Sequence, residues 1–232
     1  KLIAHEAVHE IRGWDDLRRR LAHDRRCFAF FHPALPDEPL IFVEVALTNG
    51  LAATIQPLLD LPGPDALEGQ ADELPDSAIF YSISNCQAGL AGISFGNFLI
   101  KQVVDALSTE FPRITNFATL SPIPGLCRWI DRLIEDAPPD FLDREAATTL
   151  ADPHWKLDEE TRNGLQKPLL RLCAHYLTRT SEAGLPIDPV ARFHLGNGAS
   201  VEHINWSGDN SDRGLGQSAG IMVNYRYDPD QI

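Results

Sequence analysis

Short apolar runs rich in β-branched and aromatic residues alternate in this chain with longer segments in which apolar residues recur at helical spacing. The apolar runs predict strands at residues 2–8, 27–31, 40–48, 78–84, 114–120, 199–206 and 220–227. Helical spacing predicts helices at residues 14–26, 92–111, 125–134 and 158–180, the last with an apolar stripe formed by Leu165, Leu169, Leu172, Cys173 and Tyr176. This order predicts an α/β protein with a mixed sheet flanked by helices.

Proline and acidic residues mark the connections between these elements. A proline-rich stretch at residues 32–39 joins the second and third strands and predicts a hairpin. Residues 60–76 contain six acidic residues, two glycines and three prolines, which predicts a solvated loop. Residues 136–155 are also rich in proline and acid. We expect an irregular excursion there, followed by the helix at 158–180 as an insert in the α/β order.

Composition and charge narrow the class of protein. The 232 residues suffice for one large domain or two small ones, and 44% of them are hydrophobic. The formal net charge is -13, and basic residues cluster only at residues 18–20 and 25–26, which we expect on the solvated face of a helix. This balance argues against a nucleic-acid partner. No apolar run approaches the ~18 residues of a membrane span, so we expect no membrane partner either.

The spacing of cysteine and histidine shows no pattern typical of a metal site. The four cysteines lie far apart without C-x-x-C spacing, and we interpret them as buried or incidental thiols in a reducing compartment: Cys27, Cys86, Cys127 and Cys173. His5 and His9 form the only close histidine pair, and on a strand they would lie too far apart for easy chelation. We therefore expect no bound metal.

A glycine-containing connection follows the predicted strand at 78–84. It contains Gln87, Ala88, Gly89, Leu90, Ala91 and Gly92, directly before a predicted helix. Unpaired main-chain N–H groups at a helix start suit a pyrophosphate, and the two glycines would let the backbone approach it closely. The alternative is a turn that only packs helix on strand. The element order is similar to that of the acetyltransferase (GNAT) fold, which binds acyl-CoA at this crossover.

Two short blocks far apart in the chain each hold one chemically capable side chain. In the first, Ser121 is followed by two prolines, and in the second, His194 is followed by Gly196 and Gly198. They are a candidate catalytic pair, but the residues alone also allow Ser121 to be a helix N-cap and His194 to be a loop or core histidine. The Gly-x-Ser-x-Gly turn of α/β hydrolases is missing, which argues against a hydrolase of that class.

These blocks resemble the malonyl-CoA decarboxylase family. The likeness covers nearly the whole chain and is carried by Ser-Pro-Ile-Pro-Gly from Ser121, His-Leu-Gly-Asn-Gly-Ala from His194, and Asn-Tyr-Arg-Tyr ending at Tyr227. It implies an acetyltransferase-like catalytic domain over residues 1–232, without the family's N-terminal helical domain. The chain begins with Lys1 and is expected to be a fragment. Some members of the family carry a glutamate where this chain has Ser94, so the resemblance does not extend to a carboxylate that would orient Ser121.

The resemblance implies a carboxy-lyase that converts malonyl-CoA to acetyl-CoA and CO₂, with Ser121 and His194 as catalytic residues. The thioester carbonyl can hold the electrons as an enolate, so we expect no metal, pyridoxal phosphate, biotin or thiamine. We hypothesise that His194 contacts the malonyl carboxylate and orients the proton donor, and that Ser121 delivers the proton. Tyr227, Asn197 and Ser84 are expected to bind the substrate.

Two other functions fit the same features. One is an acyl-CoA-dependent N- or O-acyltransferase, which would need a nucleophilic acceptor. The other is a non-catalytic CoA-binding regulatory domain, which would leave malonyl-CoA intact. For the full-length protein we expect a homo-oligomer. A cytoplasmic location, in a bacterium, is favoured by few lysines and many arginines and prolines.

Overall fold

The computed structural model describes residues 6, 8–11, 13–60, 74–87, 89, 96–136, 138–156 and 158–232. The expected strand at 2–8 lies outside these residues except for Glu6 and Val8, which are not part of a strand. The expected solvated loop likewise lies outside them at residues 61–73. Within the described ranges, no helix combines the length and apolar character needed to cross a membrane.

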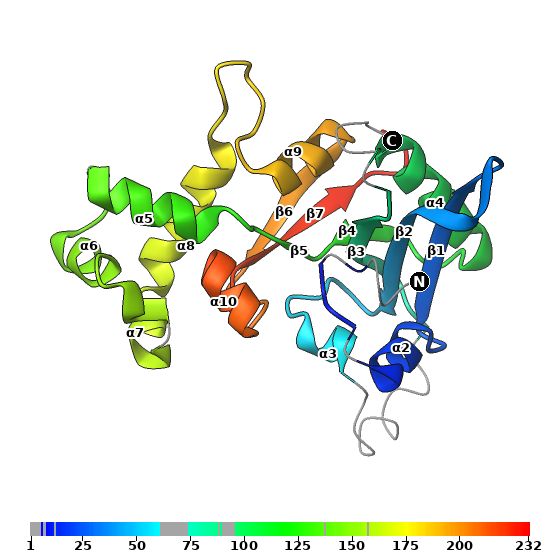
Figure 1. Cartoon of the computed structure of the whole chain (residues 1–232), viewed down its shortest axis with the longest axis horizontal. Coiled ribbons are helices and arrows are strands. Elements are labelled where there is room, and N and C mark those ends of the chain that lie inside the picture. The colour runs from blue at the N-terminus through cyan, green and yellow to red at the C-terminus, as the bar shows by residue number, and fades with distance from the viewer. Residues whose placement is uncertain are drawn as a thin grey trace.

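A seven-stranded mixed sheet organises the described part of the chain, in the order β1-β2-β3-β4-β7-β5 with β6 paired to β7 (Figure 1). Its strands are β1 (Arg25–His32), β2 (Leu35–Thr48), β3 (Ser77–Asn85), β4 (Asn116–Thr119), β5 (Ser121–Pro122), β6 (Ala199–Asn205) and β7 (Met222–Tyr227). The antiparallel β1–β2 hairpin confirms the prediction from the proline-rich connection. The strands expected at 78–84, 114–120, 199–206 and 220–227 are present as well.

Strands β3 and β4 form the parallel pair of the sheet, and α4 (Gly96–Glu110) connects them. Strand β7 pairs antiparallel with β4 at Phe117 and with β5 at Ser121. It therefore lies in the interior of the sheet although it is the last strand in the sequence. Strand β6 pairs with β7 as well, and hydrogen bonds to β7 fix the position of the segment from Thr119 to Pro122.

Alternate side chains of the strands enter two separate cores. Val45 and Phe80 pack with Leu99 and Val103 of α4. On the other face, Ala46 and Ile79 pack beside the short helix α3 (Gln56–Leu59). Because successive side chains of a strand point to opposite faces, this alternation places α3 and α4 on opposite sides of the sheet.

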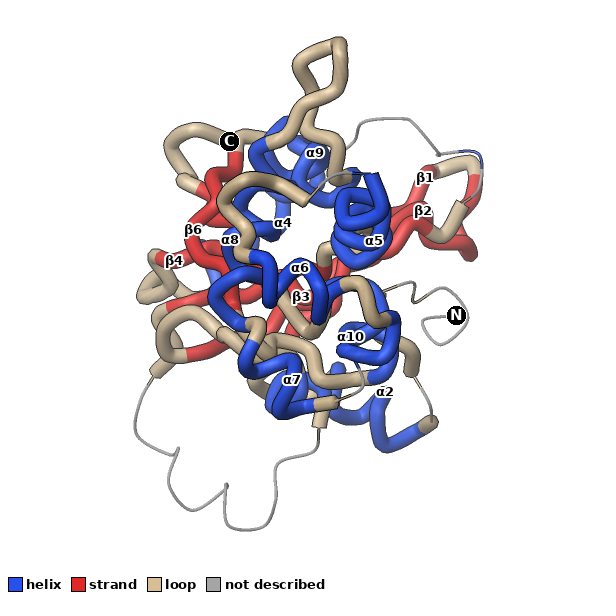
Figure 2. Tube along the Cα trace, turned by 90° about the vertical axis from the view of Figure 1, so that its left-hand side faces the viewer, coloured by secondary structure: helices blue, strands red, loops and turns tan. Residues whose placement is uncertain are grey.

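The helical insert forms a third core beside the sheet, clearly separated from α4 in Figure 1. It comprises α5 (Leu126–Asp136), α6 (Arg144–Leu150), the 3₁₀ helix η3 (Pro153–Lys156), α7 (Glu159–Gly164) and α8 (Gln166–Thr178). All five residues of the predicted apolar stripe are buried in this core. Figure 2, seen from the side of the insert, shows α5 to α8 stacked in front of the strands.

Several boundaries differ from the prediction. The single helix expected at 158–180 is divided at Leu165. Pro168 has no N–H to offer the carbonyl of Gly164, and the break places it in the first turn of α8, where no such bond is needed. The irregular excursion expected at 136–155 is wrong in part, because Asp143 caps the helix α6 through the N–H of Ala146.

Helix α2 (Trp14–Arg20) is shorter than predicted. Arg25 and Arg26 belong to β1 instead. Arg19, Arg20 and Arg25 are buried, so a solvated helix face is wrong for these three residues. Four short α-helices among the described residues were not predicted: α3, α6, α9 (Pro189–Gly196) and α10 (Asp212–Ser218).

Candidate active site

Ser121 and His194 meet in the interior of the protein. The Oγ atom of Ser121 lies 3.1 Å from Nε2 of His194. Both side chains are buried, with exposed fractions of 6% and 4%. The sequence identified these two residues as a candidate pair without being able to place one beside the other, and the fold brings them into contact.

Ser121 lies on β5 and is not a helix N-cap, because α5 begins only at Leu126. Its backbone pairs with Val223 of β7. This pairing holds the serine on the sheet while its side chain points into the interior.

His194 lies in the last turn of α9 and not in a loop. Asp188 caps the other end of this helix by accepting hydrogen bonds from the N–H groups of Val190 and Ala191. Of the two glycines that follow His194, only Gly198 has a positive φ, of 84°. Gly196 is the last residue of the helix, and Asn197 is its C-cap.

Four side chains form a continuous buried chain of hydrogen bonds, which we call the hydroxyl–imidazole chain. The Ser121 hydroxyl donates to Oγ1 of Thr119 at 2.8 Å and contacts His194 on its other side. Nδ1 of His194 lies 2.7 Å from the hydroxyl of Tyr227. Thr119 also accepts the N–H of Tyr225 at 3.1 Å. Every polar side-chain atom of the four residues therefore has a partner.

Thr119 was not among the residues singled out from the sequence. It precedes Ser121 by two positions, and side chains two apart on an extended backbone share a face. The hydroxyl of a residue two positions before Ser121 was therefore the feature of the sequence that could have identified Thr119. Thr119 is 1% exposed, and its carbonyl also accepts a hydrogen bond from Asn224 at 2.7 Å.

The site is built to keep its groups uncharged. The His194 ring stacks on Tyr225, with ring centroids 4.7 Å apart and planes at 24°. Complete burial lowers the pKa of His194 to about 3, because the charged imidazolium would lose its hydration. Burial raises the pKa of Tyr227 above its usual range for the same reason. At neutral pH the imidazole is therefore neutral and carries one ring proton.

The other predicted site residues lie in different surroundings. Tyr227 belongs to the hydroxyl–imidazole chain, as just described. Asn197 caps α9 and donates from Nδ2 to the carbonyl of Phe193 at 2.7 Å. Its amide packs tightly on α4, since a Cβ at Gly96 would lie 2.1 Å from Nδ2. Ser84 is at the end of β3, where its hydroxyl donates to Glu6 at 3.3 Å.

The predicted CoA loop is described only in part. Gln87 donates from Nε2 to the carbonyl of Pro39 at 3.1 Å, and Gly89 is exposed. The remaining four residues lie outside the described residues: Ala88, Leu90, Ala91 and Gly92. The loop nevertheless connects β3 with α4, at the crossover of the parallel pair, where the sequence placed it.

A second buried polar group, which we call the arginine cluster, lies against β2 and β3. Arg20 forms an ion pair with Glu44, and its Nη2 donates to the carbonyl of His9 at 2.8 Å. Glu6 accepts from the Ser82 hydroxyl at 2.8 Å. Burial raises the pKa of Glu44 to about 7 although Arg20 opposes this shift, and burial lowers that of His9 to about 4.

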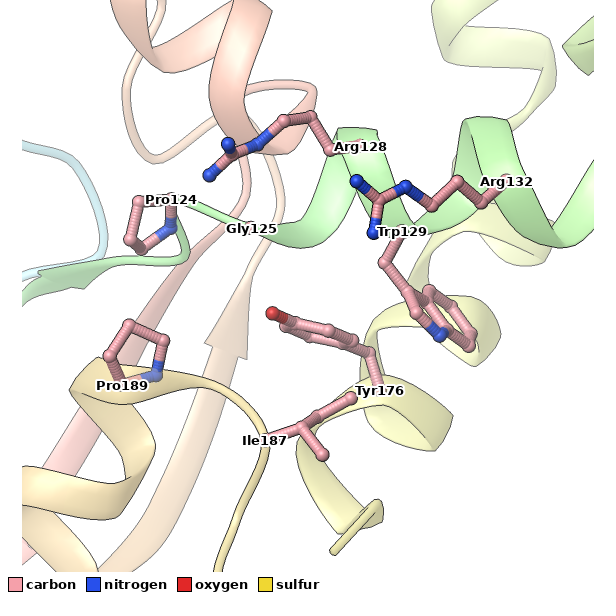
Figure 3. A pocket seen from close by; sticks show the side chains of 8 residues that line it. All are labelled: Pro124, Gly125, Arg128, Trp129, Arg132, Tyr176, Ile187 and Pro189. Atoms are coloured by element: carbon pink, nitrogen blue, oxygen red, sulfur yellow. The ribbon is translucent and has the colours of Figure 1, made fainter. Parts of the chain in front are cut away.

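A pocket of about 370 Å³ lies where the segment after Ser121 faces the start of α9. Figure 3 shows the guanidinium groups of Arg128 and Arg132 and the hydroxyl of Tyr176 directed toward it. The Tyr176 hydroxyl approaches Gly125 so closely that a Cβ there would lie 2.3 Å from the oxygen. The other lining residues are Pro124, Trp129, Ile187 and Pro189.

The described residues contain no group of three or more His, Cys, Asp or Glu side chains that could hold a metal ion. All four cysteines are free thiols. Cys127 and Cys173 are buried, and burial raises the pKa of Cys127 to about 11. Their burial agrees with the interpretation of the cysteines as buried or incidental thiols.

Comparison with known proteins gives one consistent group of relatives. A family model described as malonyl-CoA decarboxylase C-terminal domain matches residues 1–232. The chain is 41% identical over 248 residues to the mitochondrial malonyl-CoA decarboxylase of Anser anser anser, covering 98% of this chain and 49% of that protein. The corresponding protein of Rattus norvegicus is 40% identical over 243 residues, with 96% and 49% covered. The chain thus spans about half the length of the curated relatives it matches.

Solved structures extend this likeness to the fold. The malonyl-CoA decarboxylase of Rhodopseudomonas palustris is 49% identical and superimposes with a TM-score of 0.86, covering 100% of this chain and 56% of that one. A GNAT-like decarboxylase solved in complex with isobutyryl-CoA, GphF, is 18% identical with a TM-score of 0.56, covering 98% and 91%. The predicted GNAT-like mixed sheet flanked by helices is confirmed.

Proposed function

The chain belongs to the malonyl-CoA decarboxylase family, and from that premise we propose that it is a carboxy-lyase that converts malonyl-CoA to acetyl-CoA and CO₂. The observation that carries the proposal is the buried contact between Ser121 and His194, the two residues that the family resemblance implies are catalytic. Because the chain spans about half the length of its curated relatives, the activity of this domain is a question for experiment.

The reaction divides into loss of CO₂ and protonation of the carbon left behind. When the bond to the carboxylate carbon breaks, its electron pair moves to Cα and the thioester carbonyl, giving an enolate. A malonyl carboxylate bound beside the uncharged hydroxyl–imidazole chain would lose its hydration, and departure of neutral CO₂ relieves that cost. Backbone N–H groups near the end of β3 are the proposed donors to the enolate oxygen. No cofactor is required as an electron sink.

Ser121 is the proposed proton donor to Cα. Its hydroxyl forms the new C–H bond, and the neutral imidazole of His194 returns a proton from Nε2 to the serine oxygen at 3.1 Å. As Nε2 loses its proton, Nδ1 takes up the hydroxyl proton of Tyr227 at 2.7 Å, so the imidazole stays neutral, and water returns a proton to Tyr227 at the end and leaves as hydroxide. His194 also orients Ser121 and contacts the departing carboxylate.

CoA is proposed to bind along the connection between β3 and α4. Gln87, Ala88, Gly89, Leu90, Ala91 and Gly92 remain the proposed pyrophosphate contacts, because they lie at the crossover of a parallel strand pair. Tyr227, Asn197 and Ser84 remain proposed substrate contacts. Of these, Tyr227 has the strongest support, since its hydroxyl touches His194.

The assembly and location of the protein complete the proposal. A cytoplasmic location is supported by the identity to the bacterial relative, 49%, which exceeds the 41% to the mitochondrial one. The full-length protein is proposed to be a homo-oligomer and residues 1–232 to be its catalytic domain. Light scattering of this chain at several concentrations measures how much of the assembly depends on the domain alone.

The test of function is incubation of the purified chain with malonyl-CoA alone, followed by mass analysis of the CoA thioesters. The proposal requires acetyl-CoA to form without an acceptor, and Ser121→Ala to abolish its formation while the circular dichroism spectrum stays unchanged. Turnover only after addition of an amine would identify an acyltransferase instead. Saturable binding that leaves malonyl-CoA intact would identify a CoA-binding regulatory domain.

A further inference from the structure

Thr119 occupies the end of the hydroxyl–imidazole chain, opposite Tyr227. Its Oγ1 accepts two hydrogen bonds, one from the Ser121 hydroxyl at 2.8 Å and one from the N–H of Tyr225 at 3.1 Å. A backbone N–H can only donate, so this second bond fixes one lone pair of Thr119 as an acceptor. The Ser121 hydroxyl is aligned with the other lone pair.

The direction of this bond determines the rest of the chain. A serine hydroxyl has one proton, and here that proton points to Thr119. The contact between Ser121 Oγ and His194 Nε2 at 3.1 Å can then be a hydrogen bond only if Nε2 carries the proton and donates it. A neutral imidazole has one ring proton, so Nδ1 must be the acceptor, and the hydroxyl of Tyr227 donates to it at 2.7 Å.

This direction is the reverse of that found in serine hydrolases, where the imidazole accepts the proton of the serine and makes it a nucleophile. In this site a lone pair of Ser121 faces an N–H, and the serine proton faces a hydroxyl that holds it. The serine is thereby arranged as a proton carrier and not as a nucleophile toward a thioester.

We propose that Thr119 is a positioning residue that holds His194 in the Nε2–H tautomer, and that it thereby suppresses attack of Ser121 on the thioester carbonyl and directs the site to decarboxylation. The functional part of this inference rests on the proposed function, whereas the tautomer of His194 does not. Thr119 is well placed for the role because the N–H of Tyr225 and the side chain of Asn224 clamp it from β7.

Removal of the acceptor has a definite chemical consequence. In Thr119→Val, a side chain of nearly the same shape, the Ser121 proton has His194 Nε2 as its remaining partner, and the imidazole must become the Nδ1–H tautomer to accept it. Attack of Ser121 Oγ on malonyl-CoA then forms an acyl–oxygen bond and breaks the carbon–sulfur bond. The serine proton passes through His194 to the leaving CoA sulfur, and water hydrolyses the ester to malonate.

The experiment compares the wild type with Thr119→Val and Thr119→Ser, which keeps the hydroxyl. Nitrogen-15 NMR of labelled histidine, with His194 assigned from its loss in His194→Asn, reports which ring nitrogen carries the proton. We expect the Nε2–H form in the wild type and in Thr119→Ser, and the Nδ1–H form in Thr119→Val. Ser218→Ala is the matched control, because it also removes a buried hydroxyl, here one bonded to the Ile221 carbonyl at 2.7 Å.

The second readout is the product ratio together with labelling of Ser121 by a fluorophosphonate. Thr119→Val is expected to form acetyl-CoA about tenfold more slowly, to release free CoA and malonate, and to become labelled at Ser121. An Nδ1–H tautomer in the wild type, or an unchanged Nε2–H tautomer in Thr119→Val, overturns the proposal. A wild type with the expected tautomer but no acetyl-CoA refutes the proposed function and leaves the assignment of Thr119 as a positioning residue standing.

Discussion

The hydroxyl–imidazole chain and the arginine cluster are both buried polar groups, but the first consists of neutral side chains and the second contains charged ones. The first contains three hydroxyls and a neutral imidazole, and each of its polar side-chain atoms has a hydrogen-bond partner. The second contains Arg20, two glutamates and His9. Two of its buried atoms, Nε2 of His9 and Oε1 of Glu44, have no hydrogen-bond partner. Burial of a neutral group has a small free-energy cost when the group is hydrogen-bonded, whereas a buried ion needs an oppositely charged partner.

Because of this difference, we expect the two groups to have different roles, one in catalysis and the other in stability. In the hydroxyl–imidazole chain a proton can move along a fixed direction with little change of charge. In the arginine cluster, Arg20 ties α2 and the carbonyl of His9 to Glu44 on β2, so its charge serves to join segments distant in sequence. The first group is therefore expected to control turnover and the second to control unfolding.

The largest expected effect is on turnover after His194→Asn. Loss of the imidazole removes the group that returns the proton to Ser121, and kcat is expected to fall ~10²–10⁴-fold. The measurement is acetyl-CoA formation at saturating malonyl-CoA. His154→Asn, at an exposed position, is the control and should keep full activity. Full activity in His194→Asn would break the assignment of chemistry to this chain.

Substitution in the arginine cluster should affect stability instead. Arg20→Met leaves Glu44 buried without its cation, and the free energy of unfolding is expected to fall by about 3–5 kcal/mol in urea titrations. The protein that stays folded should keep its kcat. The double variant Arg20→Met with Glu44→Leu removes both charges and should regain most of the loss. Arg18→Met, whose side chain is 79% exposed, is the matched control.

His194 and Glu44, one from each group, should also respond to pH with opposite signs. The pKa of His194 is about 3 in the folded protein against its ordinary value of 6.5, so the unfolded chain takes up the proton first as pH falls. Stability from this residue is complete above pH 6.5 and is lost toward pH 3, by up to about 1.4 kcal/mol per pH unit.

For Glu44, whose pKa rises from 4.5 to about 7, the folded protein holds the proton between these values. Its contribution is complete below pH 4.5 and is lost as pH rises to about 7. Unfolding measured from pH 4 to 8 should therefore show His194→Asn flattening the acid side, and Glu44→Gln flattening the slope between 4.5 and 7. If the contributions of His194 and Glu44 to the free energy of unfolding changed with pH in the same direction, the expected difference between these residues would be wrong.

The smallest expected effect is that of the Tyr227 hydroxyl. Tyr227→Phe leaves Nδ1 of His194 without its donor, and kcat should fall about tenfold, the cost of one unsatisfied buried acceptor. Tyr225→Phe is a close control, because the Tyr225 hydroxyl is buried without a hydrogen-bond partner and its ring stacks on His194. Equal losses in the two variants would show that packing, and not the hydrogen bond, supports the imidazole.

Local pattern predicted what depends on local sequence. The long buried strands β2 and β3 and the apolar stripe of α8 followed from periodicity, because each has enough residues to define a face. Helices α9 and α10 did not. They have eight and seven residues, too few for a clear period, and depend on the caps Asp188 and Ser211.

Contacts between segments distant in the sequence could not be predicted from such local patterns. The resemblance of two short blocks pointed to Ser121 and His194, but their contact requires β5 and α9 to be brought together by the whole sheet. Arg20 was expected in solvent for the same reason, since its partner Glu44 is 24 residues away on another element. Thr119 could have been predicted from the sequence, because it precedes Ser121 by two residues on the same strand face.

The interior position of β7 also determines when the site can exist during synthesis. Thr119 and Ser121 emerge about a hundred residues before Tyr225 and Tyr227, and only the insertion of β7 beside β4 and β5 supplies the N–H that anchors Thr119 and the hydroxyl that supports His194. A nascent chain that stops before β7 therefore contains Ser121, Thr119 and His194 but lacks the strand that holds them together. Acquisition of activity by growing chains would report the completion of folding, and not the synthesis of the catalytic residues.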